Sequence, residues 1–153
     1  MKKIIILGID ASKNSTGYFI CTEKLEHIHS GTIKNKTLLE QCNIMQTLIK
    51  EYKVDCAGIE EEYVGRNKDT SKKLSRVQGG YMLLLGQLQI PYTQISISTA
   101  KTTAVKTFLT KNKKSEVAQV MYQVFGKFKN NAGNDISDAG SIAYAYIKTI
   151  LKL

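Results

Sequence analysis

The sequence lacks several features that would assign it at once to a familiar class of protein. It contains a single proline, and its three cysteines are far apart among 153 residues, with no Cys-x-x-Cys pair and no cysteine–histidine cluster. A zinc site is therefore not expected. No apolar run approaches the ~20 residues that cross a bilayer, so no membrane span is expected either. An odd number of isolated cysteines favours buried thiols in a reducing, cytoplasmic compartment.

The first residues do not resemble a targeting signal. The segment MKKIIILGID begins with a basic stretch, but its apolar part is short and no small-residue cleavage site follows it. We therefore expect the first strand of a fold rather than a signal peptide. Hydrophobic residues make up 42% of the sequence and charged residues 23%, which is ordinary for a globular protein. The length suits one domain over residues 1–153 with a hydrophobic core.

Acidic residues are nearly absent between residues 70 and 134. This segment holds ten lysines and arginines but one acid, Glu116, and so accounts for the whole net charge of +9. Such a segment indicates a polyanionic partner, above all nucleic acid, although a solvated surface gives the same pattern. Arginine is also scarce, with only Arg66 and Arg76. Because lysine suits phosphates and arginine suits bidentate base reading, we expect contacts mostly to the nucleic-acid backbone.

Hydrophobic periodicity and turn residues predict a mixture of strands and helices. Thr37 and Glu40 have the spacing of a capping box, and Ser98 is expected to cap a later helix. His27 and His29 are expected on a strand face rather than as metal ligands. The expected strands are 3–10, 16–22, 27–33, 54–60 and 92–95, and the expected helices are 38–52, 69–87, 98–109, 115–126 and 135–151. This order predicts an α/β fold with a mixed sheet and helices on both faces.

Two of the predicted strands end in the same pattern of glycine, isoleucine and an acid. The first strand ends in GID, with Asp10, and the fourth ends in GIE, with Glu60. Side chains alternate between strand faces, so each acid shares a face with the glycine two residues before it, which clears space there. If the two strands are parallel neighbours, both carboxylates meet at their carboxyl ends, where α/β sheets bind ligands. Coincidence is the alternative, because Gly-Ile pairs are common.

The last predicted helix adds two further acids. Asp135 and Asp138 are one turn apart, and Asp138 is in register with the apolar positions Ile142 and Ala145. Both acids also suit the first turn of a helix, with Asp135 as its N-cap, so a structural role stays open. Together with the strand-end acids they would form an all-oxygen site, which suits Mg²⁺ or Mn²⁺ better than zinc. Two such ions can promote cleavage of a nucleic-acid backbone.

Four motifs, in this order, resemble the RuvC Holliday-junction resolvases of the ribonuclease H-like superfamily. They are GIDASKNSTGY, IEEEYVGRNKDTSKKLSRVQGG, VKTFLTKNKKSEVAQVMYQ and DISDAGSIAYAY, and the resemblance spans nearly the whole chain. The size and the Lys/Asn-rich composition resemble a phage version more than a bacterial one. The resemblance implies a single ribonuclease H-like nuclease domain over residues 1–153, with a five-stranded mixed sheet, that acts as a homodimer in the cytoplasm of a bacterial cell.

The resemblance also implies a chemistry. The catalytic, metal-binding positions fall on the four acids Asp10, Glu60, Asp135 and Asp138. Glu60 is chosen among three consecutive glutamates because of its Gly-Ile context. Two Mg²⁺ ions are expected in each site, with Mn²⁺ as a substitute and without a nucleotide cofactor. The expected reaction is paired nicking of four-way junctions and other branched DNA, which leaves 5′-phosphate and 3′-hydroxyl ends.

The expected DNA-binding residues come partly from the resemblance and partly from the basic segment. Tyr63 falls where the family has an aromatic residue that stacks at the junction, although an ordinary half-buried loop aromatic is the alternative. The loop after Phe108 is rich in lysine and lacks the family's usual glycines. The residues expected to contact DNA are Tyr63, Arg66, Lys68, Lys72, Lys73, Arg76, Lys101, Lys106, Lys111, Lys113 and Lys114.

Alternatives remain for both the function and the homodimer. A non-catalytic protein that binds branched DNA would need none of the acids. The pattern GIDxxxxxxGY also resembles the first phosphate loop of actin-like ATPases, although those proteins need a second domain and a second glycine-rich loop. The helix after Asp69 is the expected dimer interface, unless its apolar stripe only packs on the sheet. The stripe consists of Leu74, Val77, Tyr81, Leu84 and Leu85, beside the pair Gly79-Gly80.

Overall fold

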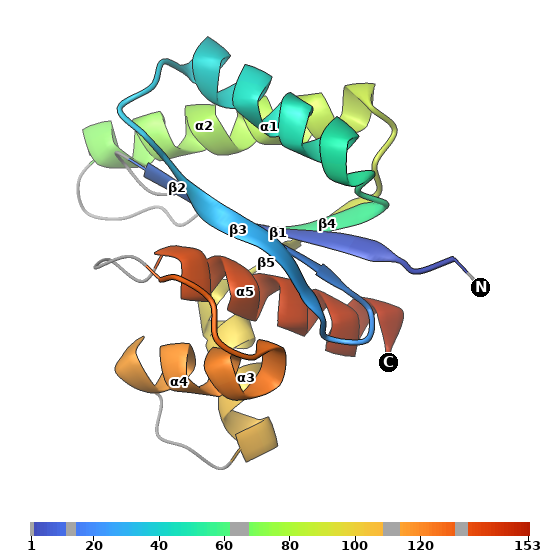
Figure 1. Cartoon of the computed structure of the whole chain (residues 1–153). Helices are drawn as coiled ribbons and strands as arrows, with labels where there is room; N and C mark the ends of the chain where they lie inside the picture. Colours follow the sequence, from blue (N-terminus) through green and yellow to red (C-terminus); the bar gives the residue numbers. More distant parts are fainter. Residues whose placement is uncertain (1, 12–14, 62–67, 109–113, 131–134) are drawn as a thin grey trace.

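The computed structural model describes residues 2–11, 15–61, 68–108, 114–130 and 135–153. Their centre is a five-stranded sheet in the order β3-β2-β1-β4-β5 (Figure 1). The strands are β1 (Ile5–Ala11), β2 (Ser15–Thr22), β3 (His27–Lys34), β4 (Cys56–Glu60) and β5 (Tyr92–Ile95). β2 runs antiparallel to β1 and β3, whereas β4 runs parallel to β1 and β5. The predicted α/β fold with a five-stranded mixed sheet is confirmed.

Helices cover both faces of this sheet, as predicted (Figure 1). They are α1 (Leu38–Tyr52), α2 (Lys68–Gln87), α3 (Ile97–Phe108), α4 (Lys114–Phe125) and α5 (Asp135–Tyr146), and a π-helical turn, Ile147–Leu151, extends α5. Alternate residues of β1 face two separate cores. Leu7 and Ile9 pack with α1 and α2, whereas Ile6 packs with α5, which α3 and α4 cover from outside.

Helix α1 begins as its sequence predicts, whereas α3 does not. The Glu40 N–H donates to the Thr37 hydroxyl at 3.1 Å and the Thr37 N–H donates to the Glu40 carboxylate at 3.0 Å, which completes the capping box. At α3 the cap is Ser96 rather than Ser98, because the Ser96 hydroxyl accepts from the Thr99 N–H at 3.1 Å. The chain turns directly from the end of β5 into this helix, so the first serine after the strand takes the capping position.

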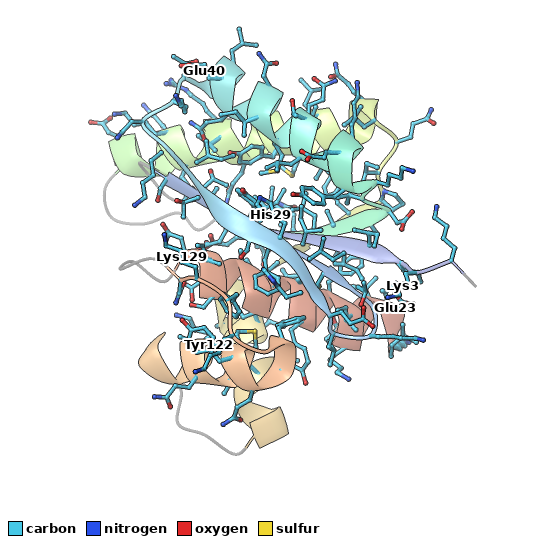
Figure 2. All side chains as sticks on the ribbon, in the orientation of Figure 1. Lys3, Glu23, His29, Glu40, Tyr122 and Lys129 are labelled. Atoms are coloured by element: carbon cyan, nitrogen blue, oxygen red, sulfur yellow. The ribbon has the colours of Figure 1, made fainter. Side chains whose placement is uncertain are left out.

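The two histidines of β3 lie on opposite faces of the sheet, although they are two residues apart. An irregularity in the pairing of β2 with β3 separates them, and a bulge of this kind reverses the alternation of side chains. His27 stacks on Phe128 on the α5 side, and His29 stacks on Tyr52 of α1. Figure 2 labels His29 on the sheet. The two rings therefore belong to different cores and cannot ligate one ion together.

The apolar stripe of α2 packs mainly on the chain's own sheet, which is the alternative to a dimer interface, and the two roles can hold together if the helix is apolar on two faces. Tyr81 is fully buried and Leu84 is 7% exposed, in the core shared with β1 and α1. Leu83 lies on the other side of the helix and is 64% exposed. Gly80 admits α1, because a Cβ there would lie 2.9 Å from the Leu38 side chain. Tyr81, Leu84 and Leu85 are therefore covered by the chain itself, whereas Leu74 and Val77 of the stripe are half-buried.

The cysteines behave as isolated thiols. Cys21 and Cys56 are buried and Cys42 is half-buried, and all three are free. Burial raises the pKa of the Cys21 thiol, so this group stays protonated at neutral pH. Among the helices that the structure describes, none combines the length and the apolar composition of a membrane-spanning segment.

Candidate active site

The two strand-end acids lie side by side at one edge of the sheet. β1 and β4 are parallel neighbours, and Ile9 pairs with Ile59, so Asp10 and Glu60 follow at the same level. This edge is therefore the carboxyl end of both strands. Asp10 is 7% exposed, and its carboxyl group is hydrogen-bonded to that of Glu60. The two strands are thus parallel neighbours, which is the arrangement that brings the acids of the two Gly-Ile-acid patterns together.

Glycines on this face admit helix α5 to the sheet. A Cβ on Gly8 would overlap the Ala139 carbonyl of α5, and one on Gly58 would lie 3.0 Å from the Ile142 side chain. Because neither glycine carries a side chain, α5 lies directly on β1 and β4. Helix α5, which carries the other two acids, therefore fills the space that Gly8 and Gly58 leave open on the face of the sheet that carries Asp10 and Glu60.

The first turn of α5 brings Asp135 and Asp138 to this edge. Asp138 is 6% exposed and points inward, as its register with the apolar positions predicts. Asp135 accepts a hydrogen bond from the Ser15 hydroxyl at 2.6 Å. Gly17 pairs with Asp10, and a Cβ on Gly17 would lie 2.8 Å from the Asp135 Cβ. Ser15 and Gly17 were not singled out from the sequence. A prediction that β1 and β2 form a hairpin with Asp10 opposite Gly17 would have placed both residues beside the acids.

The start of α5 has a second attachment. The Asn130 side chain accepts a hydrogen bond from the Ser137 N–H and donates one to the Ser137 hydroxyl, both at 3.2 Å. An N-cap residue accepts a hydrogen bond from a backbone N–H in the first turn of a helix. Here Asn130, in the segment before α5, supplies that acceptor for the Ser137 N–H. Asn130 therefore helps to fix the turn that carries the two aspartates, and the sequence alone did not single it out.

The pKa of Asp10 reflects the crowding of negative charge at this edge. It is raised to about 10, first by burial, then by the hydrogen bond to Glu60, and then by the charges of Glu60, Asp138 and Asp135. In this arrangement Asp10 is therefore protonated at neutral pH. A cation bound among these acids would displace the proton and relieve the repulsion between carboxylates.

The donor chemistry fits a hard divalent cation. All four acids offer oxygen, which Mg²⁺ and Mn²⁺ prefer to sulfur and imidazole. Within the described ranges, no three Asp, Glu, His or Cys side chains already surround one point as ligands of a single ion. The charges of Glu60, Asp138 and Asp135 nevertheless all raise the pKa of Asp10, so these three acids lie close enough to act on it. The residues that would hold a metal are therefore these acids, once the Asp10 proton has left.

Of the two glutamates of this run that the structure describes, Glu60 is the one that reaches Asp10. The Glu61 side chain is exposed, and its N–H donates to the Ile95 carbonyl at 2.8 Å, next to the ladder between β4 and β5. Alternation along the strand turns Glu61 away from the face that carries Asp10. Glu62 lies outside the described residues. This geometry agrees with the choice of Glu60.

The predicted DNA-binding residues fall into three groups. Lys68, Lys72, Lys73 and Arg76 are exposed on the first half of α2, and Lys101 is half-buried on α3. Lys106 and Lys114 belong to α3 and α4, but their side chains lie outside the described part. Tyr63, Arg66, Lys111 and Lys113 lie outside the described residues altogether.

Three exposed lysines outside the predicted set also lie near the acidic edge. Lys34 pairs with Ser15 across β2 and β3, and Lys36 follows at the turn into α1. Lys129 lies beside the start of α5, next to Asn130 (Figure 2). None of the three forms an ion pair within the part of the chain that the structure describes. Sequence reasoning missed Lys34 and Lys36 because charge alone does not reveal which edge of a sheet a lysine occupies.

Comparisons with known proteins agree with this geometry. The model of the family described as "Crossover junction endodeoxyribonuclease RuvC" matches residues 6–146. RuvC of Rickettsia bellii (strain RML369-C) is 30% identical over 159 residues, with 95% of this chain and 98% of the relative covered. RuvC of Ehrlichia ruminantium (strain Welgevonden) is 29% identical over 160 residues, with 95% and 97% covered. These relatives are bacterial, so they lend no support to the expected phage origin.

The fold has a solved counterpart. The structure of T. thermophilus RuvC in complex with Holliday junction substrate superposes with a TM-score of 0.81. The two sequences are 15% identical, and the match covers 97% of this chain and 96% of the other. At this identity the likeness establishes the fold, with the five-stranded sheet and its helices in the same arrangement.

Proposed function

The chain belongs to the RuvC family of crossover junction endodeoxyribonucleases, and we propose that it resolves four-way DNA junctions, as a single nuclease domain, by paired metal-dependent nicks. The observation that carries this proposal is the group of four acids where β1, β4 and α5 meet. Burial, the hydrogen bond to Glu60 and the charges of the neighbouring carboxylates raise the pKa of Asp10 to about 10, and a bound cation would relieve the repulsion among these groups. Structural roles alone do not account for such crowding.

The four acids divide the work at the site. Asp10, Glu60 and Asp138 are the main proposed ligands for two Mg²⁺ ions, which Mn²⁺ can replace, and Asp135 completes the set. When bound, these ions supply an activated water and stabilise the leaving oxygen. Ser15 orients the Asp135 carboxylate through its 2.6 Å hydrogen bond. Asp10 releases its proton when a cation binds. The proposed products carry 5′-phosphate and 3′-hydroxyl ends.

DNA would approach the acidic edge between two basic surfaces. One is the exposed first half of α2, and the other consists of Lys34, Lys36 and Lys129. Lysine binds phosphate as a point charge, so the proposed footprint follows the DNA backbone rather than base edges. Tyr63 is proposed to stack on a base at the point of strand exchange. This substrate would place the protein in the cytoplasm of a bacterial cell.

A homodimer would match the approximate two-fold symmetry of a four-way junction. We place its interface on the outer side of α1 and α2, where Leu39 is 71% exposed and Leu83 is 64% exposed. A groove of about 540 Å³ lies between the two helices there. Gly79 has no atom within 4 Å of a Cβ position among the described residues, so that side of α2 has room for another helix.

The interface can be tested with two leucines of one helix. Leu83→Glu should give folded monomers, because Leu83 is exposed, whereas Leu84→Glu should unfold the chain, because Leu84 belongs to the core. Sedimentation velocity and circular dichroism measure the two outcomes. A wild-type chain that is monomeric at micromolar concentration, yet nicks both strands in one binding event, would contradict the dimer.

The central experiment compares one labelled four-way junction with a fork and a linear duplex of the same sequence, with and without Mg²⁺. We expect paired nicks of like polarity in the junction only when Mg²⁺ is present. Binding of the junction without cleavage under any divalent metal would instead favour the non-catalytic alternative. Hydrolysis of ATP in the absence of DNA would favour the actin-like alternative, which the comparisons do not support.

A further inference from the structure

A buried glutamine on α2 contacts the end of β4. Gln78 is 1% exposed, and its Nε2 donates a hydrogen bond to the backbone carbonyl of Glu60 at 3.1 Å. A carbonyl oxygen can only accept, so the amide nitrogen must face Glu60 and Oε1 must face away. Within the described ranges this Oε1 is buried and has no hydrogen-bond partner.

Stability alone does not account for a glutamine at this position. An unpaired buried acceptor destabilises a fold by at least as much as one hydrogen bond stabilises it, so the Gln78 amide adds no net stability. Methionine, which has a similar length and no unpaired oxygen, would fill the same space. What the glutamine adds is a directed contact with the residue whose carboxyl group is hydrogen-bonded to Asp10.

We propose that Gln78 is a positioning residue that holds Glu60 in place for metal binding, which rests on the function proposed above. The pairing of β4 with β1 is recorded only as far as Ile59, whereas its pairing with β5 extends to Glu60 and Ile95. At the level of Glu60, β4 is therefore paired within the sheet only with β5, although Asp10 of β1 lies beside it. The amide of Gln78 supplies a second attachment from α2, outside the sheet.

The same helix provides a matched control. Tyr81, three residues further along α2, is also fully buried and donates to the Thr16 hydroxyl at 2.8 Å and to the Gln41 side chain at 3.1 Å. Neither of these partners belongs to the proposed metal-binding set. Loss of the Tyr81 hydroxyl should therefore weaken the attachment of α2 to the rest of the fold without acting on Glu60.

The test measures metal binding in the absence of DNA. Isothermal titration of Mn²⁺ into wild type, Gln78→Met and Tyr81→Phe should give an apparent Kd about tenfold higher for Gln78→Met, within the range found for groups that orient metal ligands. Tyr81→Phe should bind Mn²⁺ within about twofold of wild type but unfold at a lower temperature. The Tm of Gln78→Met should stay within about 4 °C of wild type. If Gln78→Met does not fold, Gln78→Leu replaces it with the same expected shift.

Hydrogen exchange gives a second readout that does not depend on metal. The Glu61 N–H donates to the Ile95 carbonyl at the end of β4, and its exchange should quicken in Gln78→Met but not in Tyr81→Phe. Wild-type Mn²⁺ affinity in Gln78→Met, or an equal loss in Tyr81→Phe, would overturn the role of Gln78 while leaving the nuclease proposal intact. A wild-type chain that binds no Mn²⁺ would overturn both.

Discussion

Replacing Gly17 with alanine should separate Asp135 from Asp10 without removing any acid. The added Cβ would lie 2.8 Å from the Asp135 Cβ and nearer still to its backbone, whereas ordinary contact begins at 3.4 Å. None of these atoms can rotate away, because they belong to the backbone or are attached to it directly. The start of α5 must therefore shift by roughly 1 Å, a displacement that can lower a catalytic rate by about 10²-fold.

The cost in stability follows from the same overlap. Overpacking a fitted core costs about 1–3 kcal/mol. The lower entropy of an unfolded chain with alanine offsets about 0.4–1 kcal/mol of this. The net cost is therefore about 0–2.6 kcal/mol. Because each kcal/mol changes the Tm of a chain of this length by about 2–4 °C, the Tm should fall by at most about 10 °C. Gly17→Ala should thus remain folded at 25 °C while its cleavage of a four-way junction falls by about 10²-fold.

Calorimetry and single-turnover cleavage in Mg²⁺ measure the two effects. Gly86→Ala is the matched control, because a Cβ on Gly86 would meet no atom within 4 Å among the described residues. Its position near the end of α2 should stabilise the chain by up to about 1 kcal/mol, with wild-type cleavage. A Gly17→Ala chain that cuts the junction at the wild-type rate would refute the argument that Asp135 must approach Asp10 through this gap.

Three further predictions follow from single groups. Asp10→Asn should abolish cleavage in Mg²⁺ yet bind the junction without metal about as tightly as wild type, because a pKa of about 10 leaves the Asp10 carboxyl group uncharged when no metal is bound. Glu61→Gln should cut normally, and a gel with one labelled junction measures both variants. The double variant Lys34→Ala, Lys36→Ala should bind the junction more weakly and lower the slope of log affinity against log salt by about 0.9 for each phosphate that the protein no longer neutralises, and an unchanged slope would remove β3 from the footprint. Burial and the charge of His29 lower the pKa of His27 from 6.5. The imidazole of His27 therefore binds a proton less readily in the folded chain than in the unfolded chain. The contribution of neutral His27 to the free energy of unfolding is present above pH 6.5 and is lost as the pH falls through the lowered pKa. Urea denaturation between pH 7.5 and 5 should show a smaller loss of stability in His27→Gln, and equal losses in both proteins would contradict this.

Patterns within short stretches of sequence predicted most of the secondary structure and singled out the four candidate acids. The capping box at Thr37 forms as predicted, because its partners are three residues apart and need no other part of the chain. The Gly-Ile-acid repeat indicated which strands end together, since alternation along a strand is a local property. The apolar register of Asp138 predicted that it points inward, and the structure places it there.

Pairing and packing between distant segments decided which faces the histidines occupy and which residues contact Asp135. The bulge between β2 and β3 places His27 and His29 on opposite faces, which the spacing of two residues could not reveal. The approach of α5 to the sheet gives Gly17 and Ser15 their importance, because each meets Asp135 about 120 residues away along the chain. Sequence-based reasoning has no measure of such contacts until the register of the strands is known.

The faces of α2 show the same division most clearly. The 3.6-residue period determined that the helix carries an apolar stripe, but its exposed leucine, Leu83, lies outside that stripe, and Leu84 beside it is in the core. The sequence by itself therefore indicated the family, most of the elements and the four candidate acids, because these depend on residue type and local spacing. Only the tertiary structure decided that Gln78 contacts Glu60 and that Lys34 lies at the acidic edge, because these depend on how separate elements pack and pair.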